Sequence, residues 1–255
     1  MKDPDSVWIT GASSGMGRAL ALLLAARGVE VIATARDSVA LAEMAKKQKN
    51  LFPLPADLIN HEEIERLRSW FSTRNRPLDA VVVNAGTCLY MDDAKLDMGC
   101  LRRVFEINLF AAASTIDLAL PYLERSPQGG HLVGISSMTV YLPFTRAEYY
   151  GASKAAFTYY LQSLAVDLAP RGIDVSIIYP GFVDTPLTQR NNFPMPFLMS
   201  TEAAAERIVR VLKNRPKTAA FPDPMHYLLR IIGKMPWLWH KIHKPNPLQT
   251  QENAK

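Results

Sequence analysis

The chain has few cysteines and no long apolar run. Its 255 residues include only Cys88 and Cys100, without a Cys-x-x-Cys pair or a disulfide-rich spacing, so both are expected to be structural thiols in a reducing compartment. Only a few residues precede the first predicted strand, which leaves no room for a signal peptide and indicates a cytoplasmic protein. Residues 20–26 form a short apolar run bracketed by arginines, against the ~20 residues that cross a bilayer. The sequence therefore predicts no membrane-spanning segment.

Excess positive charge is confined to the last fifth of the chain. Residues 201–255 hold ten Lys or Arg against four Asp or Glu, whereas residues 1–200 hold nineteen against twenty. Within residues 225–244 the basic side chains alternate with large apolar ones. Three interpretations stay open for this segment: membrane association with an anionic lipid surface, a wall of a pocket for a lipid-like substrate, or a terminal helix that closes over the core. No nucleic-acid motif surrounds these residues, so no nucleic-acid partner is predicted.

Short apolar runs alternate with helical stretches along the chain. The predicted strands are residues 7–10, 30–35, 51–54, 80–84, 131–136, 174–179 and 218–221. The predicted helices are residues 17–27, 39–47, 62–71, 101–123, 149–168 and 202–212. This alternation predicts an α/β fold, with a doubly wound parallel sheet covered by helices on both faces. We expect one domain over residues 1–245 with a C-terminal helical extension, followed by a disordered tail at residues 246–255.

A glycine-rich turn follows the first predicted strand. Residues 10–17 read T-G-x-x-x-G-x-G, which differs from the G-x-G-x-x-G spacing, but a turn between the first strand and the first helix is where a doubly wound sheet receives a dinucleotide. Asn84, Ala85 and Gly86 end the fourth predicted strand with small residues that let the backbone approach a nucleotide. The two turns together predict a nucleotide site.

Tyr150 and Lys154 are four residues apart, so on a helix their side chains share a face. Moving the pKa of a tyrosine from ~10 to near neutrality takes roughly 3 units. One cation at about 4 Å supplies approximately that preference. An ordinary helix face has the same spacing, and the glycine turn is what favours a catalytic pair.

Two other kinds of site have incomplete motifs. The segment Gly134-Ile-Ser136-Ser-Met138 lacks the second glycine of a serine-hydrolase elbow. His240 and His243 have metal-ligand spacing but no evident third ligand. Neither a hydrolase nor a metal site is predicted.

Over about residues 6–220 the chain resembles the short-chain dehydrogenase/reductase family. The motifs that carry the resemblance, in order, are Thr10-Gly11, Gly15, Gly17, Asp57, Asn84-Ala85-Gly86, Asn108, Ser137, Tyr150, Lys154 and Pro180-Gly181. The resemblance implies a seven-stranded Rossmann sheet, a nicotinamide cofactor and a Ser-Tyr-Lys centre with a helper asparagine. Met16 stands where isoleucine is commoner, a conservative departure.

The resemblance also implies catalytic roles. Tyr150 would protonate a carbonyl oxygen, and Lys154 would lower its pKa and hold the nicotinamide ribose. Ser137, rather than its neighbour Ser136, would donate a hydrogen bond to the same oxygen. Asn108 would bend its helix and hold a water that connects Lys154 to solvent.

The end of the second predicted strand indicates which cofactor is used. An NAD enzyme usually has an acidic residue there, whereas this chain has Ala35 followed by Arg36, whose guanidinium suits the 2′-phosphate of NADP. Asp37 keeps NAD open as an alternative. Asp57 would bind the adenine edge, and Thr185 the nicotinamide amide. The predicted cofactor-binding residues are Gly11, Ser13, Ser14, Gly15, Met16, Gly17, Arg36, Asp57, Leu58, Asn84, Ala85, Gly86, Tyr150, Lys154, Pro180, Gly181, Val183 and Thr185.

The segments that would flank the reacting carbon are apolar, including a substrate loop at about residues 181–200. They predict an NADPH-linked oxidoreductase for a hydrophobic ketone or aldehyde, or for the reverse alcohol oxidation. A non-catalytic NADP-binding sensor of the same fold is the alternative. The resemblance implies a homo-dimer or homo-tetramer paired through the helices of Asn108 and Tyr150. The predicted substrate contacts are Met138, Phe144, Phe182 and Leu187.

Overall fold

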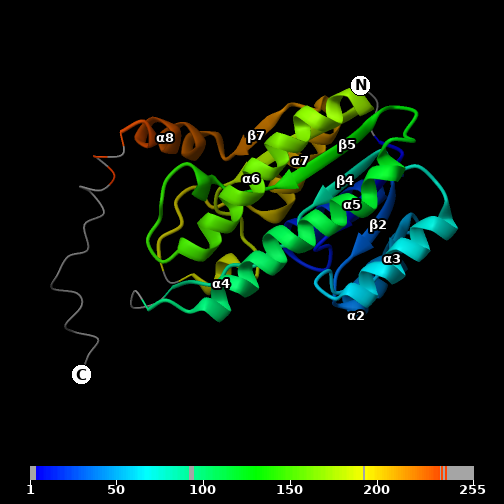
Figure 1. Cartoon of the computed structure of the whole chain (residues 1–255), viewed down its shortest axis with the longest axis horizontal. Helices are drawn as coiled ribbons and strands as arrows, with labels where there is room; N and C mark the ends of the chain where they lie inside the picture. The colour runs from blue at the N-terminus through cyan, green and yellow to red at the C-terminus, as the bar shows by residue number, and fades with distance from the viewer. Residues whose placement is uncertain (1–3, 92–94, 192, 236, 238, 240–255) are drawn as a thin grey trace.

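A computed structural model describes residues 4–91, 95–191, 193–235, 237 and 239. In this part of the chain seven parallel strands form one sheet in the order β3-β2-β1-β4-β5-β6-β7 (Figure 1). Each predicted strand is confirmed with its ends within one residue of the prediction. The strands are β1 (Ser6–Thr10), β2 (Glu30–Thr34), β3 (Leu51–Pro53), β4 (Ala80–Val83), β5 (Gly130–Ile135), β6 (Ile173–Pro180) and β7 (Thr218–Phe221).

Helices cover both faces of the sheet, as the alternation of elements predicts. One face is packed by α1 (Gly15–Ala26), α2 (Ser38–Lys47) and α7 (Thr201–Asn214), whose buried side chains form one apolar cluster with side chains of all seven strands. The other face is packed by α3 (His61–Arg74), α5 (Ala111–Leu123) and α6 (Glu148–Leu168). Because both faces are covered, β1 and β4 are buried at every position and their apolar residues follow one another instead of alternating with exposed polar ones.

The predicted helix at residues 101–123 begins earlier and is not regular. It runs as α4 (Met98–Phe105), a π-helical turn η1 (Glu106–Phe110) and α5. The Asp97 side chain caps the start by accepting from the backbone of Gly99 and Cys100, a signal that the apolar pattern alone does not contain. The stretch Met98–Leu123 is long and apolar enough to cross a membrane, with a mean hydropathy of 1.3. Since 44% of it is buried and α5 packs in the core against the sheet, it has the properties of a central core helix.

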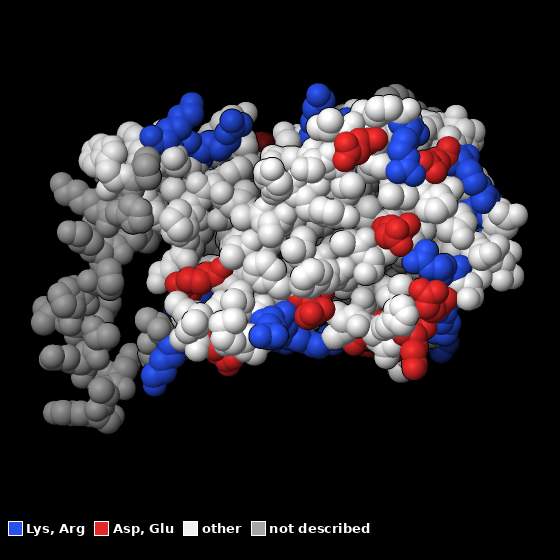
Figure 2. Space-filling view, viewed as in Figure 1, with Lys and Arg blue, Asp and Glu red and all other residues white. Residues whose placement is uncertain are grey.

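The last described helix is α8 (Asp223–Gly233), which starts two residues before the predicted C-terminal segment. Met225 and Leu229 on its inner side are buried in the core. Lys and Arg side chains gather over α8 in the space-filling view (Figure 2). His240, His243 and the tail at residues 246–255 lie outside the described residues.

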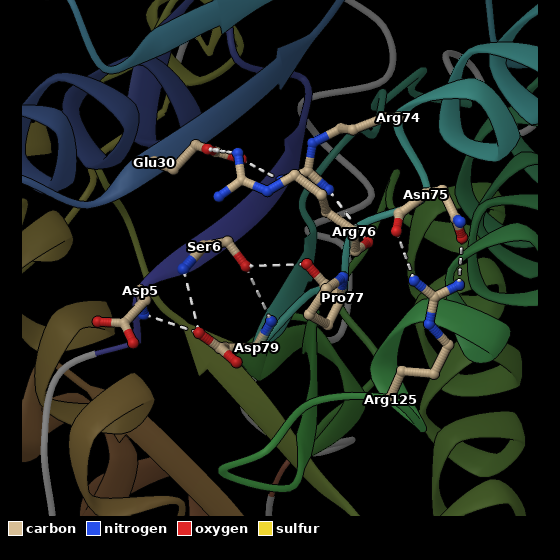
Figure 3. Close-up of polar contacts among 9 residues, drawn as sticks. All are labelled: Asp5, Ser6, Glu30, Arg74, Asn75, Arg76, Pro77, Asp79 and Arg125. Atoms are coloured by element: carbon tan, nitrogen blue, oxygen red, sulfur yellow. Dashed lines mark hydrogen bonds and ion pairs between the residues drawn. The ribbon is translucent and has the colours of Figure 1, made fainter.

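At the amino ends of the strands, polar side chains connect the central strands. Asp79 accepts hydrogen bonds from the backbone of Asp5 (2.8 Å) and Ser6 (3.2 Å), and the Ser6 hydroxyl donates to the Pro77 carbonyl (Figure 3). On the neighbouring strand, Glu30 pairs with two arginines from the end of α3 and the residues after it. These contacts fix the amino ends of the strands, which lie opposite the site described below.

Candidate active site

A cleft of about 660 Å³ lies at the carboxyl ends of the strands. β1 pairs with β2 on one side and with β4 on the other, so the sheet order reverses here, at the place where open α/β sheets bind ligands. Most predicted site residues line this cleft. They are Gly11, Ser13, Ser14, Gly15, Met16, Arg36, Asp57, Leu58, Asn84, Ala85, Gly86, Ser137, Tyr150, Lys154, Pro180, Gly181, Val183, Thr185 and Leu187.

The glycines of the first turn have separate structural reasons. Gly11 has φ +66°, and a Cβ there would lie 2.9 Å from the Ala85 Cα. Gly15 has φ +52° and begins α1, so the turn needs the left-handed conformation that glycine adopts freely. Gly17 does not line the cleft. A Cβ at Gly17 would lie 2.3 Å from the Gly11 carbonyl oxygen, so this glycine lets α1 pack against the turn.

Hydrogen bonds hold this turn against the end of β4. The Thr10 hydroxyl accepts from the backbone of Asn84 and Ala85 (3.1 Å each), and the Asn84 amide donates to the Thr10 carbonyl (3.0 Å). Ser14, the residue that precedes α1, makes no side-chain cap, and no acidic residue occupies the first turn of the helix. A close backbone and the positive end of α1 fit the diphosphate of a dinucleotide.

At the end of β2, the structure separates the two residues that bear on cofactor choice. Arg36 is exposed and lines the cleft. The Asp37 carboxylate instead caps α2 by accepting from the Ala40 backbone (2.9 Å). Asp57 also lines the cleft, and its carboxylate accepts from the Ile59 backbone (3.3 Å).

Tyr150 and its neighbour Tyr149 have different surroundings although both belong to the first turn of α6. The Tyr149 hydroxyl accepts a hydrogen bond from the Asp97 backbone (2.6 Å) and is thereby joined to the start of α4. Tyr150 lines the cleft, where its hydroxyl has a hydrogen bond with Ser137. The geometry therefore selects Tyr150 as the tyrosine available to a ligand.

The two serines after β5 are likewise divided. Ser136 shares a 2.7 Å hydrogen bond with the Thr158 hydroxyl and donates to the Lys154 carbonyl, so it anchors α6 to the sheet. The Ser137 oxygen accepts from the Thr139 backbone (3.1 Å), which leaves its proton free to be donated. Of the two, Ser137 is the one that contacts Tyr150.

Lys154 reaches the same part of the cleft from the next turn of α6. Its Nζ donates to the Ile135 carbonyl (2.8 Å) and lies 5.9 Å from the centre of the Tyr150 ring. Burial lowers the pKa of Lys154 to about 8, so the amine is near its titration point at neutral to mildly alkaline pH. The helical spacing of four therefore places the amine beside the phenol.

The lowered pKa that the sequence predicts for Tyr150 is not found in the protein without a bound cofactor. Burial raises the pKa of Tyr150 well above its usual value, and the hydrogen bond with Ser137 offsets only part of this effect. The reason is that Tyr150 and Lys154 are both desolvated, and desolvation disfavours phenolate and ammonium alike. In this state Tyr150 keeps its proton at neutral pH, as a proton donor requires.

Asn108 lies in η1 behind the cleft, where the π-helical turn interrupts the regular helix. The side chain is buried: its oxygen accepts from the Thr87 backbone (2.8 Å), and its amide donates to the Thr87 carbonyl and to Ser153 Oγ (2.9 Å each). The Ser153 hydroxyl in turn donates to the Tyr150 carbonyl (2.7 Å). Asn108 thus joins the loop after β4 to the turn of α6 that carries Tyr150.

A second polar group borders the site and has no signature in the sequence. Tyr90 donates to the Asn191 side chain and shares a hydrogen bond with the Cys88 thiol. Its ring also packs edge-on against Phe193, with centroids 6.2 Å apart. Burial raises the pKa of Cys88 to about 11, although the Lys154 charge opposes the shift. Tyr90 therefore connects the loop after β4 to the loop after β6, and the nearby thiol stays protonated.

The predicted substrate residues are distributed over three surroundings. Leu187 lines the cleft, and Phe182 lies 6.1 Å from Phe193 between ring centroids. Met138 is buried in the core, and Phe144 packs edge-on against Trp239 at 5.2 Å. Only part of the predicted apolar wall therefore faces the cleft directly.

No cluster of three or more His, Cys, Asp or Glu side chains suited to a metal ion occurs among the described residues.

Comparison with known families decides the identity of this arrangement. The family described as short chain dehydrogenase matches residues 5–195, which include the glycine turn and all four predicted catalytic residues. The chain belongs to the short-chain dehydrogenase family. It is an oxidoreductase of that family, and the family binds a nicotinamide cofactor.

Relatives and solved structures agree with this assignment. An uncharacterized oxidoreductase of Myxococcus xanthus is 37% identical over 89% of this chain and 91% of the relative. The 11-beta-hydroxysteroid dehydrogenase A of Sesamum indicum is 33% identical over 72% of this chain and 53% of its own length. A short-chain dehydrogenase from Streptomyces avermitilis superposes with a TM-score of 0.79 at 26% identity, covering 93% of this chain and 97% of its own. A Pseudomonas aeruginosa RhlG/NADP active-site complex superposes with a TM-score of 0.79 at 25% identity, covering 87% and 96%.

Proposed function

We propose that the protein reduces the carbonyl group of a hydrophobic ketone or aldehyde with NADPH, or carries out the reverse oxidation of the alcohol. The observation that carries this proposal is the convergence of Ser137, Tyr150 and Lys154 beside a glycine turn that fits a dinucleotide. A protonated phenol next to a donor hydroxyl is the arrangement that a carbonyl oxygen needs when it gains charge.

The residues have complementary tasks in this reaction. The nicotinamide supplies the hydride when the cofactor is bound. Ser137 donates a hydrogen bond to the carbonyl oxygen, and Tyr150 transfers its proton to that oxygen as negative charge develops there. Lys154 carries the charge that stabilises the resulting phenolate, and it holds the nicotinamide ribose. Asn108 keeps the Tyr150 turn of α6 in place through the Ser153 hydroxyl.

NADP is preferred over NAD in this proposal because of the residues after β2. Arg36 provides a cation at the cleft for a 2′-phosphate, while the Asp37 carboxylate is already used as the cap of α2. Replacing Arg36 by Ala should weaken the preference for NADPH over NADH on the order of tenfold to a hundredfold, since one charge-assisted contact is lost. Steady-state kcat/KM with each cofactor measures this ratio, and an unchanged ratio would contradict the assignment of Arg36.

The hydrophobic substrate class is supported by the loops around the reacting position. Phe182, Phe193 and Tyr90 form an aromatic series beside the site, and Leu187 faces the cleft. Relatives named as hydroxysteroid dehydrogenases support the same class, since a steroid is a large apolar alcohol or ketone.

The test of this function is a panel of hydrophobic ketones and aldehydes assayed by NADPH oxidation, with wild type and Tyr150→Phe in parallel. We expect turnover that depends on Tyr150, with a loss on the order of 10²- to 10⁴-fold in the variant. Equal rates in both proteins would contradict the proposed acid. NADP binding by calorimetry, without any Tyr150-dependent turnover across the panel, would instead favour a non-catalytic NADP sensor.

We also propose that two copies pair through the helices that carry Asn108 and Tyr150. The outer faces of η1 and α6 expose large apolar side chains: Phe110 (56% exposed), Tyr159 (73%) and Val166 (74%). Sedimentation of wild type and of Tyr159→Glu tests this pairing, because a buried glutamate pair would dissociate the dimer. A variant that sediments as the wild type does would contradict it.

A further inference from the structure

The helix α8 is apolar on two opposite sides. Its inner side buries Met225 and Leu229 in the core. On the outer side Tyr227 is 65% exposed, Leu228 49% and Ile231 60%. An ordinary surface helix presents polar residues to solvent, so this outer face has the composition of a covered surface although the described chain does not cover it.

Cations border this apolar outer face. Arg230 and Lys234 are four residues apart and both exposed, so they lie along one edge of the face. Neither forms an ion pair within the described part of the chain, and Asp223, the acidic residue of α8, is paired with Arg207 at 2.7 Å. Trp237, just after the helix, is 65% exposed. The group of Lys and Arg atoms over α8 is visible in Figure 2.

We propose that the outer face of α8, formed by Tyr227, Leu228 and Ile231 with Arg230 and Lys234 at its edge, rests on an anionic lipid surface. Aromatic and aliphatic side chains flanked by cations are what a helix needs to lie in the interface of an anionic bilayer. The surplus of +6 over residues 201–255 adds a long-range attraction to the same surface.

A second copy of the chain is a poorer occupant of the same face. A twofold contact places the same patch of both copies together, so Arg230 and Lys234 of both copies would lie within one interface. Like charges brought together at an interface disfavour the contact, whereas an anionic headgroup neutralises them. Charge complementarity therefore favours lipid over self-association.

The position of α8 connects this face to the catalytic cleft, and this part of the inference rests on the proposed function. A Cβ at Gly181 would lie 2.7 Å from Met225 Sδ, so α8 packs directly on a residue that lines the cleft. His226 packs edge-on against Tyr141, which follows Ser137 by four residues. The lipid face and the substrate side are thus separated by one helix, about 10 Å. A hydrophobic carbonyl compound dissolved in the bilayer would reach the cleft along this helix.

The experiment is co-sedimentation of the full chain with phosphatidylcholine vesicles, with and without phosphatidylserine. Wild type should bind the vesicles that contain phosphatidylserine, and added salt should weaken the binding. Replacing both Arg230 and Lys234 by Gln should reduce that affinity roughly thirtyfold, since each cation near the surface contributes on the order of fivefold. Ile231→Ser should reduce it severalfold. Val39→Ser is the matched control, because Val39 on α2 is 68% exposed and far from the proposed face in the fold.

Three results would overturn the lipid proposal. They are equal binding to both kinds of vesicle, α8 variants that bind as wild type does, and α8 variants that lower the sedimentation coefficient without lipid, which would identify a second copy as the occupant. All substituted side chains are exposed, and unfolding temperatures check that the variants fold. NADPH oxidation with a water-soluble ketone, without vesicles, should be unchanged in the α8 variants. Absence of any Tyr150-dependent turnover there would contradict the catalytic proposal and leave the vesicle result to be judged by itself.

Discussion

The amino and carboxyl ends of the strands carry polar residues in different surroundings. At the amino ends of the strands, Asp79 and Glu30 have their partners within the protein: Asp79 accepts from two backbone amides and from Ser126, and Glu30 pairs with two arginines. At the carboxyl ends, Lys154 is buried and Tyr150 is half-buried, each with few partners, and desolvation shifts the pKa of both toward the neutral form. Polar groups with hydrogen-bond partners stabilise the fold at the amino ends of the strands. Desolvated polar groups are available for chemistry at the carboxyl ends.

This comparison explains why the site costs stability. The buried ammonium of Lys154, with one protein acceptor, is less stable than an ammonium in water, and its lowered pKa expresses this difference. The polar networks around Asp79 and Glu30, at the amino ends of the strands, do not line the cleft. Substitutions at the carboxyl ends of the strands should therefore change mainly activity, and substitutions at the amino ends mainly stability.

A large effect on catalysis is expected at the carboxyl ends of the strands, for Lys154→Met. Loss of the charge that stabilises the phenolate should lower kcat on the order of 10²- to 10³-fold, while the free energy of unfolding stays equal or increases. In wild type, kcat/KM for reduction should fall as pH rises through about 8, because the buried ammonium loses its proton there. Stopped-flow rates and urea unfolding measure the two quantities. A variant with wild-type rates would contradict the role of Lys154.

At the amino ends of the strands, Asp79→Asn should lower stability and leave activity unchanged. The carboxylate accepts three hydrogen bonds at 2.6 to 3.2 Å, and an amide can accept at only one of its two atoms. We expect a loss of roughly 3 kcal/mol in the free energy of unfolding. kcat per folded molecule should be unchanged. A large fall in kcat would show that the amino and carboxyl ends of the strands do not act independently.

A smaller effect at the amino ends of the strands concerns the free energy of unfolding at acid pH. His131 in β5 is 1% exposed, and its Nε2 lies 2.8 Å from Ser176 Oγ. Burial lowers the pKa of His131 from 6.5 to about 4, so between these values the unfolded chain binds the extra proton. Stability is therefore lost as pH falls below about 6.5, by about 2 kcal/mol at about pH 5. His131→Gln should flatten this part of the curve of unfolding free energy against pH, and an unchanged slope would assign the effect to other groups.

The strands and the glycine turn were predictable because they depend on local patterns. Apolar runs such as residues 80–84 and 174–179 mark buried parallel strands, and the small residues at Gly11 and Gly17 mark places where a side chain would clash. The π-helical turn at Asn108 was not predictable as such, since its hydrogen bonds go to Thr87 and Ser153, which are distant in the sequence.

Long-range contacts also account for what the sequence did not indicate at the site. Tyr90 meets Asn191 across one hundred and one residues, and no local pattern announces that contact. The spacing to Lys154 predicts a lowered pKa for Tyr150, whereas in the protein without cofactor the desolvation of Tyr150 raises it, and that desolvation is a property of the packed fold. Pair spacing can be read from a sequence, but desolvation has to be obtained from the structure.

The most direct test of the account compares two adjacent tyrosines. Tyr149 is tied to the Asp97 backbone, and Tyr150 faces the cleft beside Ser137, so removing the hydroxyl has a different consequence at each position. The measurement is the single-turnover rate of carbonyl reduction by NADPH in Tyr149→Phe and Tyr150→Phe. The account predicts a rate within about tenfold of wild type for Tyr149→Phe and a loss on the order of 10²- to 10⁴-fold for Tyr150→Phe. Similar rates in the two variants would contradict it.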